Sequence, residues 1–197
     1  MSAFLGPIHF WLFNKIRIQN ELTNTIIEKT AGEGIAAKLD EKYPRLEEGE
    51  LADFIDEGNI HGWLQQRVSL VENRFAYAAA LIAGGDEKKM EEILAAAFEF
   101  GKTKQLEPGS TLEEAYRALD GILLNGMPCD HVNIMVEANV EHIIWRQVTD
   151  IHADYWIENT ADPSMYQKIR GSFIKGIFDG SEIKYEELED NCFELRR

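Results

Sequence analysis

Residues that start or stop helices recur at intervals along the chain and divide most of it into helix-length segments. Gly84-Gly85 is a typical helix stop, and Asp86 directly after it is a typical N-cap for the next helix. Residues 110–114 (Ser-Thr-Leu-Glu-Glu) have the spacing of a capping box. Asp162-Pro163 places a cap residue before a proline, which the first turn of a helix tolerates well. These signals predict a helical protein.

The predicted architecture is an all-α, up-and-down bundle of five or six helices, forming a single domain over residues 1–197. A chain of this length suits one domain, and no repeat or linker marks a second. Near the C-terminus, Ile183 and Tyr185, and then Phe193 and Leu195, alternate with charged residues, which is compatible with a short C-terminal β-hairpin. The predicted helices span about residues 7–32, 51–82, 87–104, 110–124, 131–159 and 162–178.

The chain has 35 Asp and Glu against 20 Lys and Arg, which gives a formal net charge of −15. This charge would repel nucleic acids and anionic membranes, and no dense basic run offsets it. Cys129 and Cys192 are too few for a disulfide framework, which favours a reducing compartment. The apolar N-terminal run lacks the features of a signal peptide and is shorter than the roughly 20 residues that span a bilayer. We therefore expect a cytoplasmic protein with neither a nucleic-acid nor a membrane partner.

Segment 131–159, taken as one helix, has an unusual second face. Beside the apolar arc expected for the core, His142, Trp145, His152 and Trp156 alternate imidazole with indole. A solvent face would be rich in Lys and Glu, whereas this composition is typical of the wall of a polar-aromatic pocket. Trp145, Trp156 and His152 are therefore predicted to bind a cofactor, and haem is compatible with them. The alternative for each residue taken alone is a place in the core.

Histidines from three predicted helices face the interior of the bundle. His9 and His61 each lie in an apolar stripe, and His142 lies near Glu137 and Glu141 at the edge of the apolar arc. A buried carboxylate is costly unless it pairs or binds a metal, and an arginine from another helix is the alternative partner. These five residues are predicted to meet at a metal site. Nitrogen and oxygen ligands suit iron, zinc or manganese and do not distinguish between them.

Cys129 and His131 are further candidate metal ligands, because they lie at the expected start of the long helix. Exposed amides and the helix dipole favour a thiolate at such a position. The alternative is that Asp130 caps the helix and Cys129 is a small buried residue.

Two functions from different classes follow from these patterns. The first is a helical bundle that binds a metal ion or a metal-containing cofactor, with the reaction left open. The second is a non-catalytic protein that forms a homo-oligomer through its N-terminal aromatic helix, unless that helix is central and buried on all sides. The large apolar residues that support the second function are Phe4, Leu5, Ile8, Phe10, Trp11 and Phe13.

Overall fold

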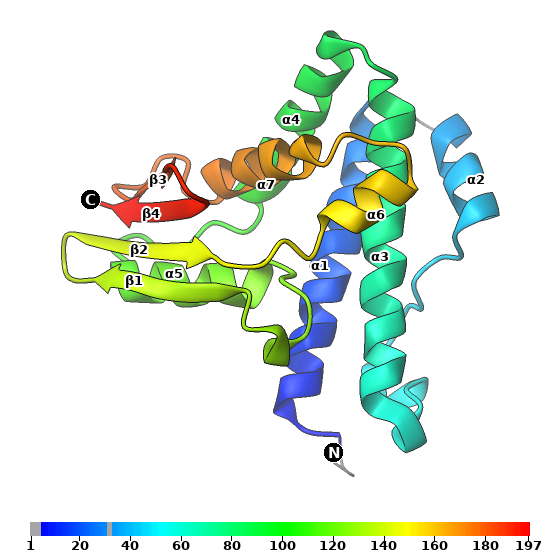
Figure 1. Ribbon diagram of the computed structural model, residues 1–197, viewed down its shortest axis with the longest axis horizontal. Coiled ribbons are helices and arrows are strands. Elements are labelled where there is room, and N and C mark those ends of the chain that lie inside the picture. The colour runs from blue at the N-terminus through cyan, green and yellow to red at the C-terminus, as the bar shows by residue number, and fades with distance from the viewer. Residues whose placement is uncertain (1–4, 31–32) are drawn as a thin grey trace.

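The computed structural model describes residues 5–30 and 33–197, which form a group of helices flanked by a small sheet (Figure 1). The helices are α1 (Pro7–Thr30), α2 (Glu33–Lys42), α3 (Ile60–Ala83), α4 (Glu87–Lys102), α5 (Leu112–Ile122), α6 (Ala153–Glu158) and α7 (Ser164–Ile177). The strands are β1 (Asn133–Ala138), β2 (His142–Gln147), β3 (Lys184–Glu187) and β4 (Cys192–Arg196). Short 3-10 turns are η1 (Leu51–Asp53), η2 (Glu57–Asn59) and η3 (Pro128–Asp130).

Helices α1 and α3 run side by side through the centre of the molecule (Figure 1). Helix α3 begins after Asn59, whose side chain accepts a hydrogen bond from the Gly62 N–H, and it ends at Gly84 in the left-handed conformation. The helix predicted over 51–82 is therefore shorter at its start, because 51–59 contains η1 and η2 instead. In the described part of the chain, none of the helices has the length and hydropathy needed to cross a bilayer.

The other helix boundaries follow the side chains that cap them. Asp86 accepts a hydrogen bond from the Lys88 N–H at 2.8 Å and so begins α4. Thr111 and Glu114 form a complete capping box at the start of α5, in which each side chain accepts from the other's backbone N–H. Both predicted starts are confirmed, because capping depends on local geometry that the sequence specifies directly.

The four strands form an antiparallel sheet in the order β1-β2-β4-β3. The predicted C-terminal hairpin is confirmed, with β3 paired to β4 across Asp190 and Asn191. Both turn residues have positive φ (57° and 54°), as tight hairpin turns require. Helix α5 covers one face of the sheet, where its Tyr116 meets the Trp145 ring edge-on at 5.2 Å.

The prediction of one helix over residues 131–159 is wrong, because this segment forms β1, β2 and α6 instead. Along β2, the buried residues Ile143, Trp145 and Gln147 alternate with more exposed ones. This period of two is typical of a strand with one covered face. The protein is therefore mostly helical with a small antiparallel sheet, rather than all-α.

The turn between β1 and β2 has its own local cause. The Asn139 side-chain oxygen accepts hydrogen bonds from the backbone N–H groups of Glu141 and His142, at 2.8 and 2.9 Å. An asparagine that bonds its own backbone in this way favours a turn over a helix. The two strands are also rich in β-branched residues, whose restricted side chains favour strands.

Candidate functional site

His9 and His61 lie together where α1 and α3 begin. Their Nε2 atoms are 3.4 Å apart, and the Gly6 N–H donates to His9 Nδ1 at 2.9 Å. A neutral His9 then carries its ring hydrogen on Nε2 and donates it to His61. Nε2 of His9 therefore offers no lone pair to a metal ion. Burial and the charge of His61 both lower the pKa of His9, so the pair resists holding two protons.

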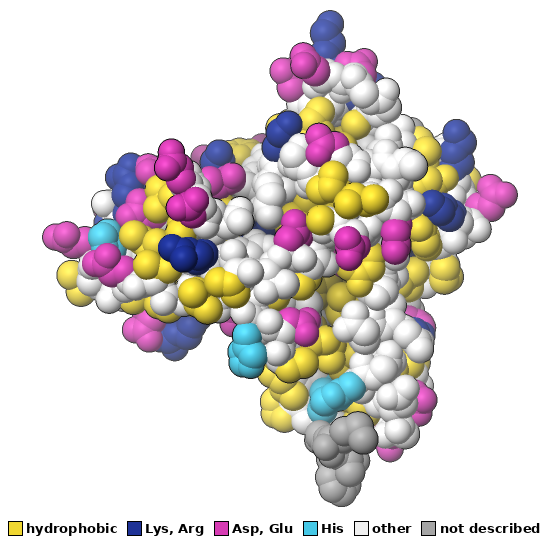
Figure 2. Space-filling view, viewed as in Figure 1, with side chains coloured by type: hydrophobic (Ala, Val, Ile, Leu, Met, Phe, Trp, Pro, Cys, Tyr) yellow, Lys and Arg dark blue, Asp and Glu magenta, His cyan; other side chains and the backbone are white. Residues whose placement is uncertain are grey.

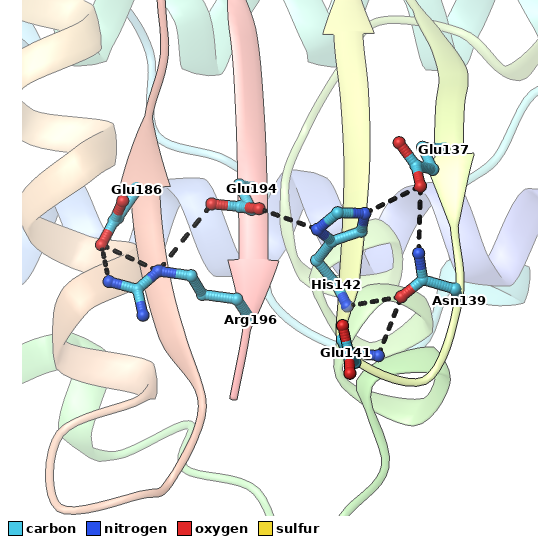
Figure 3. Close-up of polar contacts among 7 residues, drawn as sticks. All are labelled: Glu137, Asn139, Glu141, His142, Glu186, Glu194 and Arg196. Atoms are coloured by element: carbon cyan, nitrogen blue, oxygen red, sulfur yellow. Dashed lines mark hydrogen bonds and ion pairs between the residues drawn. The ribbon is translucent and has the colours of Figure 1, made fainter.

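His142 does not join this pair, so the three histidines predicted to converge do not meet. It lies in the sheet, with Nε2 2.9 Å from Glu137 Oε1 and Nδ1 3.3 Å from Glu194 Oε1 (Figure 3). The contact with Glu137 is an ion pair when the imidazole is protonated. Arg196 on β4 contacts Glu194 of the same strand and Glu186 of the neighbouring strand β3, which completes a row of alternating charges across the sheet (Figure 3). Such cross-strand pairs stabilise a sheet and need no ligand.

We expect the pKa of His142 to lie above 6.5, because Glu137 and then Glu194 favour the charged imidazole. Glu137→Gln should lower this pKa, whereas Glu141→Gln, which removes an exposed and weaker contributor, should change it less. NMR titration of the imidazole protons measures both shifts. A raised folded-state pKa stabilises the hairpin below pH 6.5, and the stabilisation is lost as the pH rises through the folded-state value. A pKa that is unchanged in Glu137→Gln would contradict the pairing.

Cys129 and His131 lie at a turn and not at the start of a long helix. Cys129 is exposed in η3, and His131 is exposed in the left-handed conformation with φ 49°, after which the chain enters β1. The helix dipole that was expected to favour a thiolate at Cys129 is therefore missing, and the alternative of a small buried residue is wrong because Cys129 is exposed. Asp130 does cap locally, because its carboxylate accepts from the Met127 N–H at 2.8 Å.

Trp145 and Trp156 lie in the core on different elements, β2 and α6. Trp145 stacks on Phe193 at 5.7 Å between ring centroids, and Trp156 meets Phe75 edge-on at 5.4 Å. The two side chains are 2% and 0% exposed, so protein covers both indoles. Each Trp therefore takes the core position that the sequence left open as the alternative.

The start of α1 leaves some of its apolar residues outside the core. Ile8 and Phe10 are 49% and 44% exposed, whereas Leu12 and Phe13 are buried. Phe4, which contributed to the same prediction, lies outside the described residues. Self-association through this helix stays a prediction.

His152 pairs with Glu72 inside the protein. Both side chains are 1% exposed, and Nδ1 of His152 lies 3.1 Å from Oε1 of Glu72. Tyr166 stacks on one face of the imidazole, with the two ring centroids 3.8 Å apart. The backbone N–H of His152 donates to the Asp150 carboxylate. Because a carboxylate only accepts, Nδ1 carries the hydrogen of this contact. The second carboxylate oxygen, Oε2, is enclosed and has no hydrogen-bond partner among the described residues. A buried carboxylate is costly in that state.

Glu72 also lines a pocket of about 520 Å³, which we call the acidic pocket. It lies between α3, the turn that contains η3, and α6, where Figure 2 shows Asp and Glu side chains on the surface. Half of its lining residues are acidic, and none is Lys or Arg. The lining consists of Gln65, Val68, Glu72, Gly126, Asp130, Asp150, Ile151, Asp154, Tyr155 and Glu158.

The carboxylates of the acidic pocket are arranged so that they repel one another. Asp154 and Glu158 are four residues apart on α6 and therefore share one helix face. Asp150 caps the same helix, since its Oδ1 accepts from the N–H groups of His152 and Ala153. Like charges at this spacing destabilise a helix by about 0.2–0.5 kcal/mol per pair, so a bound cation would relieve a cost present in the free protein.

A larger hollow of about 690 Å³ lies between α1, α2 and the segment after α2, but three arginines in its lining offset most of the charge of its five carboxylates. Arg74 lies 3.0 Å from one Asp40 oxygen, and Arg45 lies 2.7 Å from the other. Arg17 lines the same hollow, with the four glutamates of its lining. Because the acidic pocket has no Lys or Arg to offset its carboxylates, it is the better candidate site for a cation.

The residues that the sequence singled out do not line the acidic pocket. His152 lies directly behind it, as the partner of Glu72. Glu72 lies at the margin of an apolar stripe in α3. Its burial, which would have marked it as a site residue, is not visible in the sequence. The spacing of Asp150, Asp154 and Glu158 was visible in the sequence, and four-residue acidic repeats without an intervening basic residue could have indicated the pocket.

Comparison with protein-family models, curated proteins and solved structures finds no match to this chain. Within residues 5–30 and 33–197, no three His, Cys, Asp or Glu side chains are grouped closely enough to hold a metal ion.

Proposed function

We propose that this protein binds a small organic cation, of the amine or guanidinium class, in the acidic pocket. The single observation that carries the proposal is the Glu72 carboxylate, which is 1% exposed, lacks a partner for Oε2 and lines a pocket with only acidic charges. An ammonium or guanidinium group would bring the opposite charge that this lining lacks. It would donate charge-assisted hydrogen bonds to the exposed carboxylates of Asp150, Asp154 and Glu158, and such bonds are about twice as strong as neutral ones.

The dimensions of the acidic pocket favour an organic cation over a bare metal ion. Its volume of about 520 Å³ lies within the range of roughly 300–1,000 Å³ that is usual for small-molecule sites. A metal ion needs several oxygen ligands within about 2.0–2.6 Å of one point, whereas these carboxylates are distributed around the walls. Several separated carboxylates suit a ligand with more than one positive charge, such as a di- or polyamine. The metal-ion function predicted from the sequence is the second candidate.

His152 acts in this proposal as a positioning residue. Its Nδ1–H holds Oε1 of Glu72, and Tyr166 holds the imidazole ring. The carboxylate is thereby fixed in one orientation before the ligand arrives, which reduces the entropy lost on binding. His152 does not line the acidic pocket whereas Glu72 does, so the ring is placed to orient Glu72 rather than to meet the ligand.

Titration calorimetry with spermidine in low-salt buffer should reveal one saturable site in the unmodified chain. Glu72→Gln should weaken spermidine binding at least about tenfold, which corresponds to roughly 1.4 kcal/mol. The matched control is Glu91→Gln on the exposed face of α4, which makes the same change in net charge far from the pocket. This control should bind spermidine as the unmodified chain does.

The same measurements separate the proposal from its competitors. Equal weakening by Glu72→Gln and Glu91→Gln would mean that spermidine responds only to net charge, and would reject the site. Stoichiometric binding of Mn²⁺ or Zn²⁺ without any binding of spermidine would favour the metal-ion function instead.

A further inference from the structure

Strand β1 lies at a free edge of the sheet. Among the described residues it pairs with β2 on one side and has no strand on the other (Figure 1). The opposite edge, β3, has the sequence Lys-Tyr-Glu-Glu, and charged side chains of this kind protect an edge from pairing with another chain. Strand β1 has the sequence Asn-Ile-Met-Val-Glu-Ala, which contains no lysine, arginine or proline. The two edges are therefore protected to different degrees.

Apolar side chains are exposed on both faces of β1. Ile134 lies opposite Arg146 on the uncovered face of the sheet and is 45% exposed. Met135 lies opposite Trp145 on the face that α5 covers, yet it is 46% exposed. The β1–β2 hairpin and its ends, where Figure 2 shows hydrophobic side chains on the surface, hold five of the nine exposed large apolar residues in the described part of the chain: Ile134, Met135, Val136, Val140 and Val148. A concentration of this kind marks an interaction surface.

The pairing of β1 with β2 determines which backbone groups of β1 point away from the sheet. The Val148 N–H donates to the Val132 carbonyl at 2.8 Å, so Val132 directs its backbone groups toward the β2 side. Because these groups alternate in direction along an antiparallel strand, Ile134 also faces β2, whereas Asn133 and Met135 face outward. Beyond Met135 a bulge makes the ladder irregular. A strand that pairs with this edge would therefore bond to Asn133 and Met135, on either side of Ile134.

Charge favours β1 as the place where two copies of this chain can meet. With a net charge of −15 on each copy, most surfaces of two copies repel each other. Glu137 is the one charged residue of β1, and its Oε1 lies 2.9 Å from Nε2 of His142. Two β1 strands can therefore approach without bringing a row of unpaired carboxylates together.

We propose that two copies of this chain pair through β1, antiparallel and about a two-fold axis at Ile134. Asn133 of each copy then exchanges backbone hydrogen bonds with Met135 of the other, and the two Ile134 side chains lie directly opposite each other. The joined sheet ends in β3 on both sides, so the apolar edges are closed and the charged edges face solvent.

Light scattering over a range of concentrations should show the mass of the purified protein rising from that of one chain toward that of two. Ile134→Glu should abolish this rise, because it places like charges directly opposite each other across the axis. Within each copy the new carboxylate faces Arg146, which suits the fold. The matched control Leu188→Glu makes the same change in charge at a 40% exposed residue after β3, and it should associate as the unmodified chain does. Mixing Ile134→Glu with Ile134→Lys chains should restore association, which unfolded variants would not do.

Oxidative cross-linking locates the axis. In the Cys129→Ser, Cys192→Ser background, Ile134→Cys should form a disulfide between two copies, because the Cα atoms of directly opposite residues lie about 4.5–5.5 Å apart and a disulfide needs roughly 4.4–6.8 Å. Val140→Cys, at a more exposed position in the β1–β2 turn, should not. A purified protein that stays a single chain at every concentration would overturn the proposal and leave this edge to a segment of another protein. A dimer that persists in Ile134→Glu would overturn it as well and would place the contact on another surface, such as the start of α1.

Discussion

Lys15→Met should stabilise the fold at neutral pH by about 2–3 kcal/mol and should remove a rise in stability between pH 8 and 10. The Lys15 side chain is 3% exposed, and its ammonium lies 4.0 Å above the Trp11 ring. Burial lowers its pKa from 10.5 to about 8, against a weaker opposing effect from Asp120. Each pKa unit corresponds to about 1.4 kcal/mol, and the lost contact with Trp11 offsets part of the gain.

The sign of this pH dependence follows from proton binding. Between pH 8 and 10.5 the unfolded chain holds a proton on Lys15 that the folded chain has released, so stability rises with pH. Burial raises the pKa of Tyr166 and Tyr185, which makes stability fall again above about pH 10. The difference between Lys15→Met and the unmodified chain isolates the lysine.

Urea unfolding at several pH values between 6.5 and 10 measures this difference in the free energy of unfolding. Lys88→Met, at an exposed position on α4, is the matched control and should follow the unmodified chain at every pH. Parallel curves for Lys15→Met and the unmodified chain would mean that the buried ammonium is not penalised.

The sequence was informative about the fold where a local interaction determines the structure. The capping box at Thr111, the cap at Asp86 and the Asp190-Asn191 turn each depend on neighbouring residues, and all three are present. The prediction of one helix over residues 131–159 failed because the apolar residues of this segment fit a period of 3.6 as well as a period of two. What separates the two is pairing of β2 with β4, almost 50 residues further along the chain, which no local pattern contains.

The candidate site was less predictable than the fold, because burial and pairing are tertiary properties. His9 and His61 were placed on converging stripes and do lie together, but the Gly6 N–H determines which nitrogen carries the hydrogen. Glu72 stood at the margin of an apolar stripe, and its position in the sequence did not show that it is buried. Its meeting with His152, 80 residues away, depends on α6 crossing α3.

Gly176→Ala should destabilise the protein by about 3 kcal/mol or more, at the upper end of the cost of overpacking. Helices α4 and α7 cross in direct backbone contact at Gly176 and Gly101. A Cβ at Gly176 would overlap the carbonyl oxygen of Phe98 and would lie 3.0 Å from the Gly101 Cα. Both obstacles are backbone, which cannot rotate aside as a side chain can, so the helices would have to separate.

Urea unfolding of Gly176→Ala beside Gly34→Ala distinguishes close approach from the intrinsic effect of adding a methyl group. Gly34 is exposed in α2, and a Cβ there would meet no described atom within 4 Å. Its replacement by alanine should stabilise the chain by about 0.5–1 kcal/mol, through helix propensity and the reduced entropy of the unfolded chain. Opposite signs for the two variants are therefore expected. A gain in stability for Gly176→Ala would show that α4 and α7 do not cross in backbone contact.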